Sequence, residues 1–238
     1  MIKYKTYYKR NLPHYQPPGE TFFVTYRLDG SLPYEIINKL KAGREKVLEE
    51  ISGYANLAVR KEKYKAYQSQ YFGKFDKLLD GAGYGPNWLK EDNVAQIVKD
   101  AIHYYDKKTY DLICYTIMSN HVHQVFTPIF PNVGRDSSRP PKQQNISNEN
   151  NCDINVELHF PPVTNILRLL KGRTSRQCNK VLNLSGTFWQ HESYDHVVRN
   201  YKELIRIVEY VLNNPVKAGL CEKWGDWKWS YCNFELLG

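Results

Sequence analysis

The sequence predicts an α+β fold, in which antiparallel strands form a sheet that carries helices on one face. Two apolar runs, 110–118 and 121–127, are separated only by the bend at Ser119-Asn120, as expected for neighbouring strands of one sheet. Segment 93–105 repeats its apolar residues at helical spacing. With 238 residues, 42% of them hydrophobic, the chain is long enough for one domain with a packed core.

The first half supplies a strand and a charged helical region. Residues 19–28 alternate as a strand, and Gly30 and Pro33 stop it. A heavily charged helical pattern follows over 34–79, with a break near Gly53. A glycine- and proline-rich turn, "LLDGAGYGPNWL", leads from there into the helix of 93–105.

The second half supplies two more helices. Residues 163–182 are predicted as a helix that contains basic residues but no acid, and 187–200 as a short strand or loop. Residues 201–220 form a helix that Pro215 and Gly219 close. The aromatic tail, "WGDWKWSYCNFELLG", is expected to pack on the body.

The chain is expected to form one domain over 1–238 with three additions. Residues 1–18 are a basic N-terminal arm, 34–79 a helical insertion, and 129–161 a polar loop insertion without periodicity.

Composition narrows the partners and the compartment. A net charge of +8 with 19 tyrosines suits a polyanion whose bases can stack, although a tyrosine-rich core in a basic protein would have the same composition. Five cysteines without a CxxC pair indicate free thiols and a cytoplasmic protein. No apolar run approaches the length of a membrane span.

The motif His121-Val122-His123 lies on a predicted strand. Successive strand side chains alternate between faces, so the two imidazoles share one face. Two neutral imidazoles can bind one divalent ion through one nitrogen each. The alternative is a pair of histidines that are solvent-facing or hydrogen-bonded.

Tyr210 and Asn214 lie four residues apart on the last predicted helix, hence on the same side of it. The alternative is a boundary tyrosine and a capping asparagine ahead of Pro215.

Several motifs together resemble the REP-associated tyrosine transposases, which are one-tyrosine members of the HUH transposases. The resemblance covers most of the chain, and residues 129–161 depart from it as a longer link than the family has. The segments that carry it are "LPHYQPPGETFFVTYRLDGSLP", "LLDGAGYGPNWL", "YTIMSNHVHQVF", "LKGRTSRQCNKVL", "GTFWQHESYDHVVRN" and "IVEYVLNNPVKAGL".

The resemblance implies a ferredoxin-like or RRM-like fold and a transposase that cuts and joins single-stranded or hairpin DNA. Tyr210 would be the nucleophile and form a 5′-phosphotyrosine. His121, His123 and Asn214 would bind Mg²⁺ or Mn²⁺. Asn213 is the alternative to Asn214 as the third ligand, but the four-residue spacing from Tyr210 favours Asn214. The family contains monomers and homodimers, and its setting implies a bacterial cytoplasm, at the nucleoid.

Basic residues are the candidates for phosphate contacts. They are Arg168, Lys171, Arg173 and Arg176 of the acid-free helix, and Lys3, Lys5, Lys9 and Arg10 of the N-terminal arm. His196 could assist proton transfer or make a structural hydrogen bond, and it is left out of the catalytic set.

Two other functions compete with the transposase. A domesticated nucleic-acid-binding module would keep the fold without turnover, and it would have no need of Tyr210. A hydrolytic metal nuclease or an RNA-binding protein would not require a tyrosine on a helix above the histidines.

Overall fold

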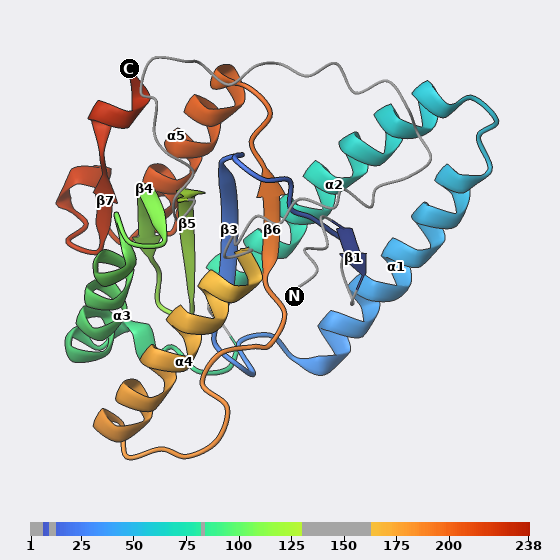
Figure 1. The fold of residues 1–238 in the computed structure, drawn as a ribbon. Helices are drawn as coiled ribbons and strands as arrows, with labels where there is room; N and C mark the ends of the chain where they lie inside the picture. Colours follow the sequence, from blue (N-terminus) through green and yellow to red (C-terminus); the bar gives the residue numbers. More distant parts are fainter. Residues whose placement is uncertain (1–6, 10–12, 82–83, 130–162) are drawn as a thin grey trace, which may run out of the picture.

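The centre of the molecule is a five-stranded antiparallel sheet in the order β6-β3-β5-β4-β7 (Figure 1). The computed structural model describes residues 7–9, 13–81, 84–129 and 163–238. The strands of the sheet are β3 (Phe22–Arg27), β4 (Tyr110–Ile117), β5 (His121–Pro128), β6 (Tyr194–Val197) and β7 (Ser230–Cys232). The predicted α+β class with an antiparallel sheet is confirmed.

The middle strand, β5, carries the histidine motif. It pairs with β4 on one side and with β3 on the other, and the bend at Ser119-Asn120 connects it to β4. In the register with β3, Thr25 lies opposite His123 and Arg27 lies opposite His121. These four side chains therefore point to the same face of the sheet.

One face of the sheet is covered by α3 (Asp92–Tyr105) and α4 (Val163–Val181), which pack against each other. Val98 and Ile166 join a core with Val24 and Val122 of the strands. Burying each such aliphatic side chain contributes about 1.5–3 kcal/mol.

The other face is covered by α5 (Tyr201–Lys217) and the C-terminal end of α2 (Leu57–Asp80). Val211 of α5 packs with Phe23 and Val125 of the strands, and Phe72 of α2 borders them. Helices were expected on one face only. The second layer of helices covers the other face as well, so all six residues of β3 are buried. The histidines face this second layer.

Helices α1 (Tyr34–Ser52) and α2 form an antiparallel pair that extends past the β6 edge of the sheet (Figure 1). The expected break is at Gly53, and Asn56 caps α2 by accepting hydrogen bonds from Ala58 N and Val59 N. The pair corresponds to the predicted helical insertion of 34–79.

Two glycine turns meet at the end of β3. Gly30 and Gly85 both have left-handed backbones, with φ of +72° and +68°. A Cβ on Gly85 would lie 2.0 Å from Gly30 O, so only glycine allows the approach. Nearby, Leu89 N donates to Ser119 O at 3.1 Å. The turn thus fixes the segment after α2 against the sheet.

The ends of the chain add short elements. Within the expected arm, β1 (Tyr7–Lys9) pairs with β2 (Pro13–Tyr15), and the tail contributes β7 at the sheet edge. Short 3₁₀ helices span Trp88–Lys90, Trp224–Asp226 and Phe234–Leu237. The expected loop insertion, 129–161, lies outside the described residues apart from Ile129.

Helix α5 lies within the predicted range of 201–220, and Pro215 lies inside its last turn. It runs to Lys217, because a proline in the last turn removes only one intrahelical hydrogen bond. Gly219 follows the C-cap residue Ala218 and has a left-handed backbone with φ of +70°. Across the described ranges, none of the helices combines the length and apolar character that crossing a membrane would require.

Candidate metal and nucleophile site

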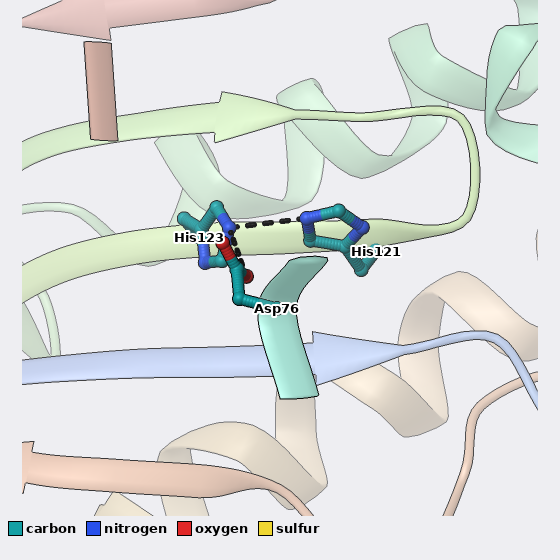
Figure 2. Close-up of side chains that lie close together, drawn as sticks. All are labelled: Asp76, His121 and His123. Atoms are coloured by element: carbon teal, nitrogen blue, oxygen red, sulfur yellow. Dashed lines mark hydrogen bonds and ion pairs between the residues drawn. The ribbon is translucent and has the colours of Figure 1, made fainter. Parts of the chain in front are cut away.

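The two imidazoles of β5 point toward each other on the face that α2 and α5 cover (Figure 2). Their Nε2 atoms are 3.0 Å apart, and both side chains are completely buried. Adjacent strands and the two helices exclude water from this part of the sheet. The sequence prediction that both histidines share a face is confirmed.

Neighbouring side chains fix the orientation of His121. Asn120 Nδ2 donates to Leu79 O at 3.0 Å, so the amide oxygen of Asn120 is turned toward His121 Nδ1, at 2.7 Å. His121 Nδ1 therefore carries the hydrogen, and its Nε2 presents a lone pair to the site. Burial, and then the neighbouring His123, lower the pKa of His121 to about 3, so this ring is neutral at neutral pH.

His123 has an equivalent support on the neighbouring strand. Its Nδ1 lies 2.7 Å from Thr25 Oγ1, which can accept the ring hydrogen and leave Nε2 facing His121. Two lone pairs that face each other at this distance repel unless a proton or a cation lies between them. The pair is therefore arranged as a donor set for a cation.

A carboxylate that sequence reasoning missed completes the cluster. Asp76 reaches the histidines from α2, with Oδ1 3.1 Å from His123 Nε2 (Figure 2). Ligand atoms of Asp76, His121 and His123 all lie within 4.8 Å of one another. Burial opposes ionisation of Asp76, but the positive charges that His123 and His121 carry when protonated, and a hydrogen bond from Asn214, hold its pKa below the ordinary value.

A second acid of α2 lies one turn further on. Asp80 Oδ1 is 3.8 Å from His121 Nε2. Burial and the negative charge of Asp76 raise the pKa of Asp80 to about 6. The spacing Phe72-x₃-Asp76-x₃-Asp80 was the available sequence signal, since it sets two acids in line with an aromatic on one helix face.

Tyr210 reaches the same carboxylate from α5. Its hydroxyl donates a hydrogen bond to Asp76 Oδ2. The half-buried ring lies against Phe23, Phe72 and His123, with centroid distances of 6.1, 5.9 and 5.7 Å. The Lys217 ammonium lies 4.6 Å from the centroid of the same ring. The tyrosine and the histidines therefore converge within one chain.

Asn214 lies one turn further along α5 and is fully buried, whereas Asn213 is exposed. Its Nδ2 is 3.2 Å from His123 Nε2 and 3.4 Å from Asp76 Oδ2. Because an amide binds metals through oxygen, Asn214 would have to turn its amide to act as the predicted ligand.

The residues present suit a divalent cation that prefers oxygen. Among the described residues, three buried oxygens at the cluster have no hydrogen-bond partner: Asp76 Oδ1, Asp80 Oδ1 and Asn214 Oδ1. Unsatisfied buried oxygens are costly, and a cation would satisfy them. Two imidazoles with at least one carboxylate fit Mn²⁺ or Mg²⁺. The carboxylate supplies a negative charge, which the predicted ligands His121, His123 and Asn214 lacked.

The predicted DNA-binding residues of α4 lie on the opposite face of the sheet. Arg168 and Arg176 are exposed there. Lys171 Nζ instead bonds Gln190 O at 2.8 Å, and the Arg173 guanidinium lies 4.1 Å from the ring centroid of Tyr104. These two basic side chains therefore also have structural contacts. Of the arm residues, Lys3, Lys5 and Arg10, and the side chain of Lys9, lie outside the described part.

His196 makes a structural hydrogen bond, one of its two expected roles. Its Nε2 lies 3.1 Å from Glu203 Oε1, which belongs to the first turn of α5. Glu203 also accepts from Arg199 N and donates its own N–H to the cap Asn200. This pair holds the start of α5 against β6.

Comparison with solved structures shows a distant likeness. The fold is similar to a solved structure of a REP-associated tyrosine transposase bound to a REP hairpin, with a TM-score of 0.47 and 16% identity. The match covers 94% of this chain and 80% of that one. No protein-family model and no curated protein matches the sequence. The function proposed below therefore depends on the side chains of this site.

Proposed function

We propose that this chain is a metal-dependent enzyme that cuts and rejoins single-stranded or hairpin DNA through a covalent bond to Tyr210. One observation carries the proposal: Asp76 accepts a hydrogen bond from the Tyr210 hydroxyl and also lies 3.1 Å from His123 Nε2. A potential nucleophile and a potential metal-binding cluster thus share one buried carboxylate.

His121, His123 and Asp76 would hold the ion, with Asp80 and a turned Asn214 as further oxygen donors. The ion would be Mg²⁺ or Mn²⁺, and it would withdraw charge from a scissile phosphate. Asn120 and Thr25 hold the two imidazoles in the orientation that ligation needs.

Tyr210 oxygen would attack the phosphorus and form the tyrosine phosphodiester, while the bond from phosphorus to the 3′ oxygen breaks. The phenolic proton passes first to Asp76 Oδ2, which already accepts the hydrogen bond. Asp76 then passes this proton on to the departing 3′ oxygen, which becomes a hydroxyl. The 5′ side stays on Tyr210, so attack by another 3′ hydroxyl can rejoin strands without external energy.

The position of Tyr210 argues against a module that only binds nucleic acid. Binding requires no phenol hydrogen-bonded to a buried carboxylate beside two buried imidazoles. A hydrolytic nuclease would activate water at the same cluster, and it would leave no protein bound to DNA. The presence of a covalent adduct therefore separates these functions.

The test is a denaturing gel of labelled hairpin DNA incubated with protein and Mn²⁺ or Mg²⁺. The wild-type protein is expected to give a labelled adduct that boiling in detergent does not remove. Tyr210→Phe should reduce the adduct by at least about a hundredfold while DNA affinity changes less than about threefold, because the ring remains and the nucleophile is lost.

Tyr104→Phe is the matched control, since Tyr104 is an exposed tyrosine of α3 on the opposite face. It should leave adduct formation unchanged. Adduct that persists in Tyr210→Phe would refute the assignment of the nucleophile. Cleavage without any adduct would favour the hydrolytic nuclease.

A further inference from the structure

A cavity lies beside the candidate metal and nucleophile site, on the same face of the sheet. It has a volume of about 100 Å³ and is lined by residues of β3, α1, α2 and the segment that enters β6. We call it the aromatic cavity. It includes Thr25, the residue that holds His123 Nδ1, and Phe72, whose ring centroid is 5.9 Å from that of Tyr210. Thr25 and Phe72 therefore border both the aromatic cavity and the candidate metal and nucleophile site.

The walls of the aromatic cavity are flat rings. Tyr71, Phe72 and Phe75 of α2 line it together with Tyr194. Phe72 and Tyr194 are stacked, with ring centroids 4.4 Å apart. Aromatic faces of this kind take up nucleic-acid bases, because every base has a π face to stack on.

A buried arginine contributes the charge. Arg27 is only 6% exposed and lines the aromatic cavity, with its guanidinium 5.8 Å from the ring centroid of Phe75. It donates to Ser31 Oγ at 2.9 Å, yet within the described residues no carboxylate comes within ion-pair distance of it. The charge of Asp29 reaches Arg27 only from beyond ion-pair distance, so the buried guanidinium is suited to a closer anion from outside, such as a phosphate.

The other charged side chains that line the aromatic cavity leave its net charge positive. Lys41 and Arg44 of α1 add two cations, and Glu192 adds one acid. A water molecule needs about 10–15 Å³ of such volume, so about 100 Å³ suits a group of the size of one nucleobase and excludes a base pair.

We propose that the aromatic cavity receives one unstacked nucleotide of the DNA strand, next to the phosphate that Tyr210 attacks. Its base lies among Tyr71, Phe72 and Phe75, and its phosphate pairs with Arg27. This inference rests on the proposed function and adds a substrate requirement to it. The strand must be unpaired at that nucleotide, because only a base outside a duplex can enter.

The test couples a change in the protein to a change in the DNA. The probe is the hairpin with single-stranded flanks that binds tightest in a selection from a randomised pool. Variants of this probe carry a single abasic site at each flank position in turn. Dissociation constants are measured by fluorescence anisotropy for the wild-type protein and for Phe75→Leu, which keeps an apolar side chain but removes the ring.

For the wild-type protein, one abasic position is expected to weaken binding by about fivefold or more. In Phe75→Leu, that penalty should fall to less than about twofold, while penalties at the other positions stay unchanged. Phe234→Leu is the matched control, because Phe234 is exposed in the C-terminal 3₁₀ helix, and it should keep the wild-type profile.

Two further measurements keep the proposal falsifiable if Phe75→Leu does not fold. Tyr71→Leu changes a neighbouring ring of the same cavity and should flatten the profile in the same way. Arg27→Gln should remove the sensitivity to a neutral methylphosphonate placed at the phosphate of the same nucleotide. Equal profiles in the wild-type protein and all these variants would overturn the proposal.

The adduct distinguishes this failure from a failure of the proposed function. If Tyr210 forms the adduct but no position couples to the aromatic cavity, only the nucleotide pocket is refuted. If no adduct forms with the wild-type protein, the proposed function fails, whatever the abasic profile shows.

Discussion

Asp76 connects three functional groups of the site. It accepts from the hydroxyl of Tyr210 and the amide of Asn214, and its other oxygen faces His123. It is almost completely buried, at 3% exposed. Removing its charge should therefore affect ion binding and the tyrosine together, a coupling that separate structural roles would not produce.

Asp76→Asn tests this role through metal affinity. We expect Mn²⁺ affinity, measured by calorimetry without DNA, to fall by at least about tenfold, because the amide cannot replace the carboxylate charge. Asp92→Asn is the control, since the Asp92 side chain is 70% exposed at the surface and pairs with Lys228. Unchanged affinity in Asp76→Asn would exclude Asp76 as a ligand.

Asp80 gives a prediction for pH. Its pKa is raised in the fold to about 6, so the folded state holds the proton more tightly than the unfolded state. Its contribution to stability is present below the ordinary pKa of 3.8 and is lost as pH rises through about 6. Without metal, Asp80→Asn should therefore stabilise the protein at pH 8 by about 1–2 kcal/mol, and have little effect near pH 4.

Melting temperatures of both proteins at pH 4 and pH 8, in the presence of a chelator, measure this difference. His121 has the opposite sign, because its pKa is lowered and its contribution is lost as pH falls from 6.5 toward 3. Both proteins contain His121, so its contribution cancels when Asp80→Asn is compared with the wild-type protein. A gain at pH 4 that equals the gain at pH 8 would contradict the assigned shift.

At the scale of elements, the end of α2 must be fixed for Asp76 to reach β5. The contact of Gly85 with Gly30 and the hydrogen bond from Asn120 to Leu79 O hold the turn that follows α2. The helical insertion of 34–79 thereby contributes Asp76 to the site.

Gly85→Ala should destabilise the protein by more than about 2 kcal/mol, since strain at positive φ adds to a steric clash. Gly219→Ala is the control, because its φ of +70° is nearly the same and nothing lies within 4 Å of the added Cβ. Urea unfolding of both variants gives the comparison. Equal losses of stability would mean that the close approach to Gly30 is not essential.

Most long elements were predictable from sequence, because amphipathic spacing and apolar strands report burial directly. The break near Gly53 and the bend at Ser119-Asn120 are examples. Strands β1, β2 and β7 were missed, since three residues show no periodicity. The histidines and Tyr210 were predictable because they belong to recognisable motifs. Asp76 was not, because in the sequence it is one of many charged residues of a predicted solvated helix, and only the fold places it against β5.

At the scale of the whole molecule, the basic helix and the candidate site lie on opposite faces of one sheet. A groove of about 390 Å³ beside α4 is lined by Arg168 and by the segment from His191 to Ser193. Glu192 and Ser193 also line the aromatic cavity on the other face. We expect DNA held along α4 to reach the site around the β6 edge.

This path predicts a salt effect from a distant face. Arg168→Ala together with Arg176→Ala should reduce the slope of log affinity against log salt by about 1.5, because two phosphate contacts are lost. Adduct formation at saturating DNA should remain. The paired change Lys39→Ala and Lys46→Ala, on exposed positions of α1, should leave the slope unchanged. An unchanged slope in the arginine variant would exclude α4 from the DNA path.

The most direct test of the shared site is peptide mapping of the covalent product by mass spectrometry. Wild-type protein incubated with hairpin DNA and Mn²⁺, then digested with nuclease and protease, should carry a nucleotide mass on the peptide that contains Tyr210. The modification should disappear with a chelator and in the His121→Ala and His123→Ala variants. A nucleotide on another residue, or one formed equally well without metal and histidines, would contradict the account.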